Sequence, residues 1–560
     1  MAMVKKALPP ALFLFIAVVI LYPNPFGNNP DIILDESYFL TSSLASIEKH
    51  TLPGWEFSPS GAYYGGIQTY VDTAVLIPVV ASVVIVEHFS LSAAKLWVAI
   101  NTGELLHILR LVSGATALGA ILFCFFLFKK RKVPQPLALT LTLFLFLLLS
   151  NVLVIEFLHT AKMWAYYIIF VALTSAFFIA QEYYLAERNE EFFKRRTYVA
   201  LMVWSVILTF FQSFVGAFSV GLLMLYSYLL GHFTIRDVWQ HVAKYWYLIA
   251  LVCATQVSFL YRLYMIRESI ADESAKTLDG SIDWFPRLVK PLIYAIEGHP
   301  LFLLFPIVIV ALIIIAARNK QFFSGKRKRS FLILIALYPV FTYLFFHLIV
   351  GFDVAARYGI PLTLAGAFSV AILLGEIGKG VARGVLVIAL ALFALIGVHA
   401  ISLYWQPSSE SVLLDTIKAR FNSPDTIFIT DHSARRMTLP VNYASLALLD
   451  EERQAMSRFA FLLQNREQLA ADTSFKPLTI TAYRDEQMTA ALARFATSTN
   501  AVWVISRDCT ARCAESEAST GRCFEINTKA CGLSPQEVNT LPVFLASDQL
   551  GYSYIVRKVR

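Results

Sequence analysis

The first residues that could do chemistry are two adjacent carboxylates, Asp35 and Glu36, in the string Asp35-Glu36-Ser37-Tyr38. Carboxylates this close repel each other, which raises the pKa of one of them and suits it to accept a proton as a general base. A solvated turn that caps a helix would produce the same string. The pair therefore predicts either a base that activates a nucleophile or a simple polar turn.

A second group of ionisable residues, Glu156, His159 and Lys162, lies between two apolar segments in the short stretch 151–163. Three ionisable groups between membrane helices are costly unless they are paired or take part in function. The alternative is an interfacial cluster whose long side chains reach the lipid headgroups. This stretch is the second candidate for a functional site.

Arg357 is an isolated cation, because Lys379 is the only other Lys or Arg between residues 330 and 382. A guanidinium at the head of a helix suits a phosphate at the depth of the bilayer surface, although pairing with Asp353 would also explain it. A long polar loop, 265–300, precedes this stretch and includes His299. Loops of this length are often functional.

The composition identifies the setting of these groups. Of the 560 residues, 57% are apolar and 15% are charged, against about 45–50% and about 25% in soluble proteins. The surplus lies in blocks such as 137–149 and 301–317, which have the length of transmembrane helices. This excludes a soluble enzyme, a disordered chain, a coiled coil and a disulfide miniprotein. Aromatic residues, at 14%, fit interfacial belts, so we predict a polytopic α-helical membrane protein.

About eleven spans are predicted from the apolar segments. The first, 7–21, follows Lys5 and Lys6 but lacks an Ala-x-Ala cleavage pattern, so it is expected to stay as an uncleaved helix. The segments 198–212 and 213–231 fit two spans or one long broken helix. The other candidates are 105–128, 136–155, 162–185, 244–264, 300–317, 331–350, 358–376 and 384–404.

The distribution of charge sets the expected orientation. With the N-terminus in the cytoplasm, 20 of the 30 Lys and Arg residues before Gln406 fall on the cytoplasmic side, but only 6 of the 22 Asp and Glu residues do. Cytoplasmic loops carry this excess of cations in membrane proteins. The order holds only if 68–103 does not cross the bilayer. We therefore predict an interfacial helix there, within one external loop, 22–104.

The C-terminal part, 406–560, differs from the rest of the chain. It holds 17 Lys plus Arg against 17 Asp plus Glu and no apolar run long enough to span a membrane. The β-branched runs 426–430 and 502–506 alternate with helical patterns at 450–469 and 484–495. An odd number of spans places this part outside. We expect a small external α/β domain after a membrane domain of residues 1–405.

Four cysteines cluster in this external part: Cys509, Cys513, Cys523 and Cys531. Four cysteines allow three pairings, and an oxidising exterior favours two disulfides. A zinc site is the alternative, but the spacing lacks a paired Cys-x-x-Cys. The sequence therefore predicts disulfides, with their connectivity left open.

The layout of residues 1–404 resembles the GT-C superfamily of membrane glycosyltransferases, in particular aminoarabinose transferases and protein O-mannosyltransferases. Two short strings carry the resemblance: Asp35-Glu36-x-Tyr38 after an uncleaved first helix, and a late Arg357-Tyr358-x-x-Pro361. An amphipathic segment that ends near Phe89 completes it. The resemblance implies a polytopic fold with catalysis at the external face and a polyprenyl-phosphate-linked sugar as donor.

The resemblance also implies roles for the residues that match. Asp35 is the expected catalytic acid of the first loop, with Glu36 as the alternative, and Glu156 is the second acidic position. Arg357 is the expected contact of the donor phosphate. The residues expected to help bind the substrates are Tyr38, His159, Lys162, His299 and Tyr358.

We therefore expect an inverting membrane glycosyltransferase of the bacterial inner membrane. Its partners would be a lipid-linked sugar donor, a lipid, glycan or protein acceptor and the membrane lipids, without nucleic acid. No cofactor is identified, and a divalent cation is left open. Two alternatives remain: a lipid-linked glycan flippase or polymerase, and a non-catalytic scaffold that presents the C-terminal domain.

Overall fold

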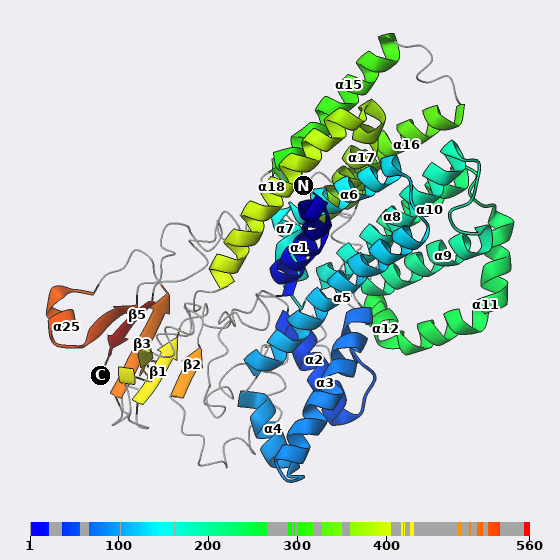
Figure 1. The fold of residues 1–560 in the computed structure, drawn as a ribbon. Coiled ribbons are helices and arrows are strands. Elements are labelled where there is room, and N and C mark those ends of the chain that lie inside the picture. The colour runs from blue at the N-terminus through cyan, green and yellow to red at the C-terminus, as the bar shows by residue number, and fades with distance from the viewer. Residues whose placement is uncertain are drawn as a thin grey trace.

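The computed structural model consists of a large helical part and a small mixed sheet near the C-terminus (Figure 1). The helical part is described over most of residues 2–404, and the sheet through its five strands and the segment between β3 and β4. The described ranges are 2–21, 36–55, 66–100, 102–161, 163–213, 216–265, 300–318, 326–349, 359–404, 426–430, 479–482, 501–507, 513–526 and 554–559, with a few single residues or pairs between them.

Many of the helices overlap the predicted apolar segments. In chain order they are α1 (Ala2–Leu21), α2 (Glu36–Lys49), α3 (Gly66–Val86), α4 (Leu91–Ile100), α5 (Thr102–Lys130), α6 (Gln135–Leu149), α7 (Val152–Leu158), α8 (Met163–Glu187), α9 (Arg195–Gln212), α10 (Ala217–Leu229), α11 (Ile235–Thr255), α12 (Val257–Met265), the 3-10 turn η1 (Pro300–Leu303), α15 (Leu304–Arg318), α16 (Lys326–Tyr343), the π-helical turn η2 (Leu344–Ile349), α17 (Ile360–Ile377) and α18 (Lys379–Tyr404).

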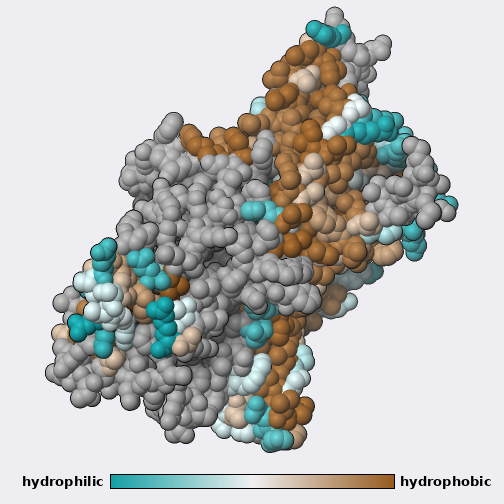
Figure 2. Space-filling view, turned by 60° about the vertical axis from the view of Figure 1, so that its left-hand side comes forward, coloured by the Kyte–Doolittle hydropathy of each residue, from teal (hydrophilic) through white to brown (hydrophobic). Residues whose placement is uncertain are grey.

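Several of these helices are long and apolar enough to cross a membrane. Six described helices meet this condition, or seven spans if α6 and α7 count as one, and three more apolar helices are shorter. Figure 2 shows a broad hydrophobic surface over the helical part. The chain is therefore a multi-pass membrane protein, while the predicted number of eleven spans is not confirmed. The six are α3, α5, α8, α16, α17 and α18.

The segment predicted as an interfacial helix forms α3 and α4. By length and composition α3 could span a membrane. However, α3 packs mainly against α2 and less against α9 and α5. Figure 1 shows that α3 does not run parallel to α8 and α9. The interfacial placement of this segment stays a prediction.

Two predicted spans are interrupted. The span predicted at 136–155 is wrong as a single helix, because the chain bends by 77° between α6 and α7. The Ser150 hydroxyl donates to the Phe146 carbonyl at 2.6 Å, and the Asn151 side chain accepts from the Val154 N–H and caps α7. These local hydrogen bonds compete with helix continuation. The span predicted at 244–264 likewise breaks between α11 and α12.

The uncertain pair of spans consists of two separate helices, α9 and α10. The hydroxyls of Tyr198, at the start of α9, and Ser227, near the end of α10, share a buried hydrogen bond of 2.8 Å. The two helices are therefore antiparallel neighbours rather than one broken helix.

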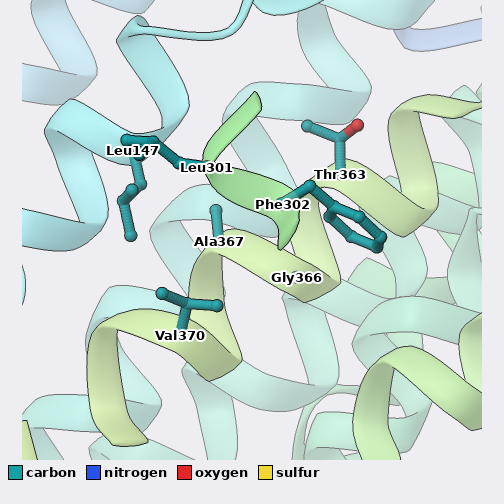
Figure 3. A pocket seen from close by; sticks show the side chains of 7 residues that line it. All are labelled: Leu147, Leu301, Phe302, Thr363, Gly366, Ala367 and Val370. Atoms are coloured by element: carbon teal, nitrogen blue, oxygen red, sulfur yellow. The ribbon is translucent and has the colours of Figure 1, made fainter. Parts of the chain in front are cut away.

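The centre of the core is α17, which packs against α6, α15, α16 and α18. Fifteen of its 18 residues are buried. Small residues allow this close packing, since a Cβ at Gly366 would lie 2.5 Å from the Phe302 ring. Figure 3 shows the small apolar pocket that remains between α6, η1 and α17. It is lined by Leu147, Leu301, Phe302, Thr363, Gly366, Ala367 and Val370.

Many of the basic residues predicted to share one side of the membrane lie at one end of the helical part, which we call the basic end. Several of their side chains make contacts there between segments far apart in the chain. They include Arg131 over the Phe192 ring, Arg195 with Asp237, Arg327 with Glu182, and Lys328 with Glu376. Which side of the membrane this end faces stays a prediction.

The C-terminal sheet has the strand order β2-β1-β3-β5-β4. The three strands β1, β2 and β3 are parallel, whereas β5 is antiparallel to β3 and β4. The two predicted β-branched runs are confirmed as β1 and β3, while the predicted helices at 450–469 and 484–495 lie almost entirely outside the described residues. The strands are β1 (Thr426–Thr430), β2 (Thr479–Ala482), β3 (Ala501–Arg507), β4 (Cys523–Ile526) and β5 (Tyr554–Lys558), with the short helix α25 (Glu515–Ser519) before β4.

One disulfide is present in the described part of this sheet region. Cys513 and Cys523 are bonded, with their Cα atoms 5.7 Å apart. Arg557 of β5 also pairs with Glu517 of α25 at 3.1 Å. The other two cysteines of the cluster, Cys509 and Cys531, lie outside the described residues, so their pairing stays a prediction.

Candidate functional site

Two of the predicted site residues have described side chains, Glu156 and His159. Glu36 and Tyr38 lie on the first turn of α2, but their side chains are outside the described part. The remaining predicted residues lie wholly outside the described ranges: Asp35, Lys162, His299, Arg357 and Tyr358. The described part of the site therefore consists of Glu156, His159 and the helices around them.

His159 links the turn after α7 to α1. It follows α7 directly and is 2% exposed. With Nε2 protonated, its ring donates a hydrogen bond of 2.7 Å to the Val19 carbonyl near the end of α1. The ring therefore holds the turn in place, and this nitrogen is not available to a substrate.

Burial also decides the charge of His159. Removal from water is the main cause that lowers the pKa of His159 to about 4; the bond to Val19 raises it in part, and the nearby charge of Arg110 lowers it by a smaller amount. The ring is therefore neutral near pH 7. A neutral ring that is bonded to the backbone is a weak candidate for a cationic phosphate contact, so we assign His159 a positioning role.

The same turn packs against the segment that begins with Glu36. Ala161 is fully buried in a hydrophobic cluster with Leu40 and Leu44 of α2 and Leu109 of α5. The turn of residues 159–161 thus lies between the end of α1 and the first half of α2. This geometry brings the stretch that holds Glu156 to the helix whose first residue is Glu36. We call this end of the helical part the site end.

Two charged residues that the sequence reading overlooked are buried at the site end. Asp72 of α3 is fully buried, and Arg110 of α5 is 5% exposed. The charge of Arg110 acts on His159, while the charge of Asp72 acts on the Tyr166 hydroxyl of α8, which also lies near Ser113. Buried charges among membrane helices are rare and commonly functional. Their signal in the sequence is a single acid or base within an apolar run.

Neutral amide groups connect the remaining helices at this end. The N–H of Gln68 in α3 donates to the Gln212 side chain of α9 at 3.0 Å. Gln212 in turn donates to the carbonyl of Met163, the first residue of α8, at 3.0 Å. The side chain of Gln256 fills the space beside Gly66, where a Cβ would collide with it. These contacts join the start of α3 to the start of α8, the end of α9 and the residue after α11.

The described residues do not form a metal-binding group, since no three His, Cys, Asp or Glu side chains among them are placed to hold an ion. The predicted acids of the first loop lie outside this set, so the metal requirement stays open.

Comparison with known proteins gives structural neighbours alone: no protein-family model and no curated protein matches the chain. ArnT from Cupriavidus metallidurans, solved with undecaprenyl phosphate, is similar over 98% of this chain and 97% of its own, with 11% identity and a TM-score of 0.44. Its apo form gives 12% identity and a TM-score of 0.46. The neighbours are glycosyltransferases of the GT-C type.

An oligosaccharyltransferase from Archaeoglobus fulgidus is a further neighbour, with 11% identity and a TM-score of 0.40 over 89% of this chain and 67% of that one. The resemblance stated from the sequence was to membrane glycosyltransferases that include aminoarabinose transferases. Identities this low give no residue-by-residue correspondence, so the roles of individual residues are argued from the contacts above.

Proposed function

We propose that this chain is an inverting GT-C-type glycosyltransferase that moves a sugar from a polyprenyl-phosphate donor to an acceptor at the external, periplasmic face of the bacterial inner membrane. The observation that carries the proposal is the packing of the turn 159–161 between α1 and α2. This packing supports one shared site for the Asp35-Glu36 pair and Glu156, at the end of α5 and α8 opposite the basic end.

In the proposed reaction, Asp35 or Glu36 accepts the proton of an acceptor hydroxyl. The acceptor oxygen then bonds to the anomeric carbon of the donor, and the bond from that carbon to the phosphate oxygen breaks. The phosphate leaves with the bonding electrons as an already ionised group, so it needs no general acid. Arg357, Tyr358 and Lys162 are the proposed contacts of the leaving phosphate, while Tyr38 and His299 contact the substrates.

Glu156 and His159 take different parts in this scheme. Glu156 is partly exposed at the end of α7, so its carboxylate is proposed to contact the acceptor or the sugar. His159 keeps α7 and the turn in place through the Val19 carbonyl. Asp72 and Arg110 are buried at the same end. The charge of Arg110 acts on His159, and the charge of Asp72 acts on the Tyr166 hydroxyl.

The test replaces each acid of the pair while keeping its size. Asp35→Asn and Glu36→Gln are expected to differ, with the variant that lacks the true base losing about 10²–10⁴-fold in transfer. Membranes that contain the full-length variants receive a polyprenyl-phosphate sugar and native membrane acceptors. The matched control is Glu87→Gln, on the turn after α3, which should transfer normally. Near-normal transfer by both variants would place the base elsewhere and favour the scaffold alternative.

A further inference from the structure

The helix α11 is bent in a way that the predicted span does not explain. Its backbone leaves the helical region at Tyr245, with φ −116° and ψ 19°. Figure 1 shows the two parts of α11 running in different directions at the right-hand edge of the molecule, with the second part returning toward α12. The first part, residues 235–244, is therefore not an extension of the segment that follows it.

The start of α11 is fixed at the basic end. Thr234 and Asp237 form a capping box, and the guanidinium Nε of Arg195, at the start of α9, donates to Asp237 at 2.9 Å. Burial alone would raise the pKa of Asp237, but the hydrogen bonds from Thr234 and the ion pair with Arg195 outweigh it and lower the pKa. The one acid of this part is thus paired with the protein.

The exposed surface of residues 235–246 carries large aromatic and cationic side chains. Ile235 is 57% exposed, Trp239 67% and Trp246 65%. At about 100° per residue Ile235 and Trp239 fall on one stripe of the helix, whereas Trp246 follows the break at Tyr245. Arg236 is exposed next to this stripe, and Lys244 is exposed on the other side of the helix. Among the described residues no acid pairs with either cation, and Lys244 lies 5.1 Å from the Tyr245 ring centre.

This combination of groups suits the boundary between headgroups and acyl chains. Tryptophan is enriched at that depth, because its ring is apolar while its N–H donates a hydrogen bond. Residues 235–244 also include Arg236, Gln240, His241 and Lys244, which would be costly in the hydrocarbon core. Basic residues in such a helix attract anionic lipids.

We propose that residues 235–246 form a docking surface for anionic phospholipid headgroups. Arg236 and Lys244 pair with the lipid phosphates, while Trp239 and Trp246 lie at the level of the headgroups. Charge complementarity at the basic end favours this occupant over a neutral lipid or a protein partner. The surface is separate from the proposed catalytic site, so either proposal can fail without the other.

The test measures lipid selectivity around the full chain, reconstituted in phosphatidylcholine vesicles with spin-labelled phosphatidylglycerol or spin-labelled phosphatidylcholine. Electron paramagnetic resonance gives the ratio of the two association constants. We expect Arg236→Gln/Lys244→Gln to lower binding of the anionic probe at this surface by about fivefold per charge, as expected for a cation at a membrane surface. The control Arg522→Gln/Lys558→Gln, in the sheet region, should leave the ratio unchanged.

The depth of Trp239 provides the second measurement. The difference in fluorescence quenching between the wild-type protein and Trp239→Phe should be largest with lipids brominated near the headgroup. Quenching mainly by lipids brominated near the chain ends, or no quenching at all, would overturn the proposal. An unchanged ratio in Arg236→Gln/Lys244→Gln, or an equal loss in the control, would also overturn it.

Discussion

The two ends of the helical part are held together by different chemistry. At the basic end, Glu182 of α8 is 3% exposed and takes two hydrogen bonds from Arg327 of α16 and one contact from the buried His232. At the site end, neutral groups link several helices, from Gln68 to Gln212, from Gln212 to Met163 and from His159 to Val19, beside one partly exposed ion pair of Lys95 in α4 with Glu48 in α2. A buried ion pair therefore links α8 to α16 at one end, while amide and backbone groups link α1, α3, α8 and α9 at the other.

This difference fits different roles for the two ends, one structural and one in binding a substrate. A buried ion pair needs a complete set of partners, because a lone buried charge is strongly destabilising. A site that binds a charged substrate cannot use all its charges on permanent pairs. At the site end, the links through Gln68, Gln212 and His159 use no carboxylate and no cation.

The largest expected effect on stability breaks the charge network of the basic end. Glu182→Ala leaves the buried His232 and Arg327 without their shared partner, so the free energy of unfolding should fall by about 3 kcal/mol, at the low end for buried pairs since Arg327 is partly exposed. Thermal unfolding in detergent measures the loss. The matched control, Glu376→Ala, removes the half-exposed partner of Lys328 and should cost about 1 kcal/mol or less. Equal losses in Glu182→Ala and Glu376→Ala would mean that the buried network of Glu182 contributes no more to stability than the partly exposed pair of Glu376 and Lys328.

The next effect concerns the neutral contact of the site end. The pKa of His159 is lowered to about 4 by burial, whereas the unfolded chain has an ordinary histidine pKa of about 6.5. As the pH falls below 6.5, the unfolded state takes up the proton first, so stability decreases toward pH 4. Between pH 6.5 and pH 5 the loss should be about 2 kcal/mol.

The variant His159→Gln separates this effect from other titrations. Glutamine can still donate to the Val19 carbonyl, but it does not titrate. Unfolding measured at pH 6.5 and pH 5 should therefore show a smaller acid loss in the variant than in the wild-type protein. The same acid loss in both proteins would mean that His159 is already protonated in the folded state.

Much of the helical layout could be predicted from the sequence, because the preference of a long apolar run for the membrane is a local property. The segments that form α5, α8, α17 and α18 show this. The break after α6 could not be found in the same way, since it depends on the hydrogen bonds of Ser150 and Asn151 rather than on hydropathy. The bend within α11 is a further example.

The site was predictable in part for a related reason. Glu156 and His159 stand out as polar residues in a short turn, so their placement at one end follows from the order of the spans. Asp72 and Arg110 are single charges within apolar runs, and their role depends on which helices pack together. That packing joins residues far apart in the chain, such as His159 and Val19, and no local pattern reports it.

The central claim is that the Asp35-Glu36 pair and Glu156 act in one site, and a double-mutant cycle on transfer tests it most directly. The rates of the wild-type chain, Asp35→Asn, Glu156→Gln and the double variant are measured in membranes supplied with a polyprenyl-phosphate sugar. Residues that act as a unit are not additive, so the double variant should be about as slow as the slower single variant. A double variant whose loss equals the product of two separate losses would contradict a shared site.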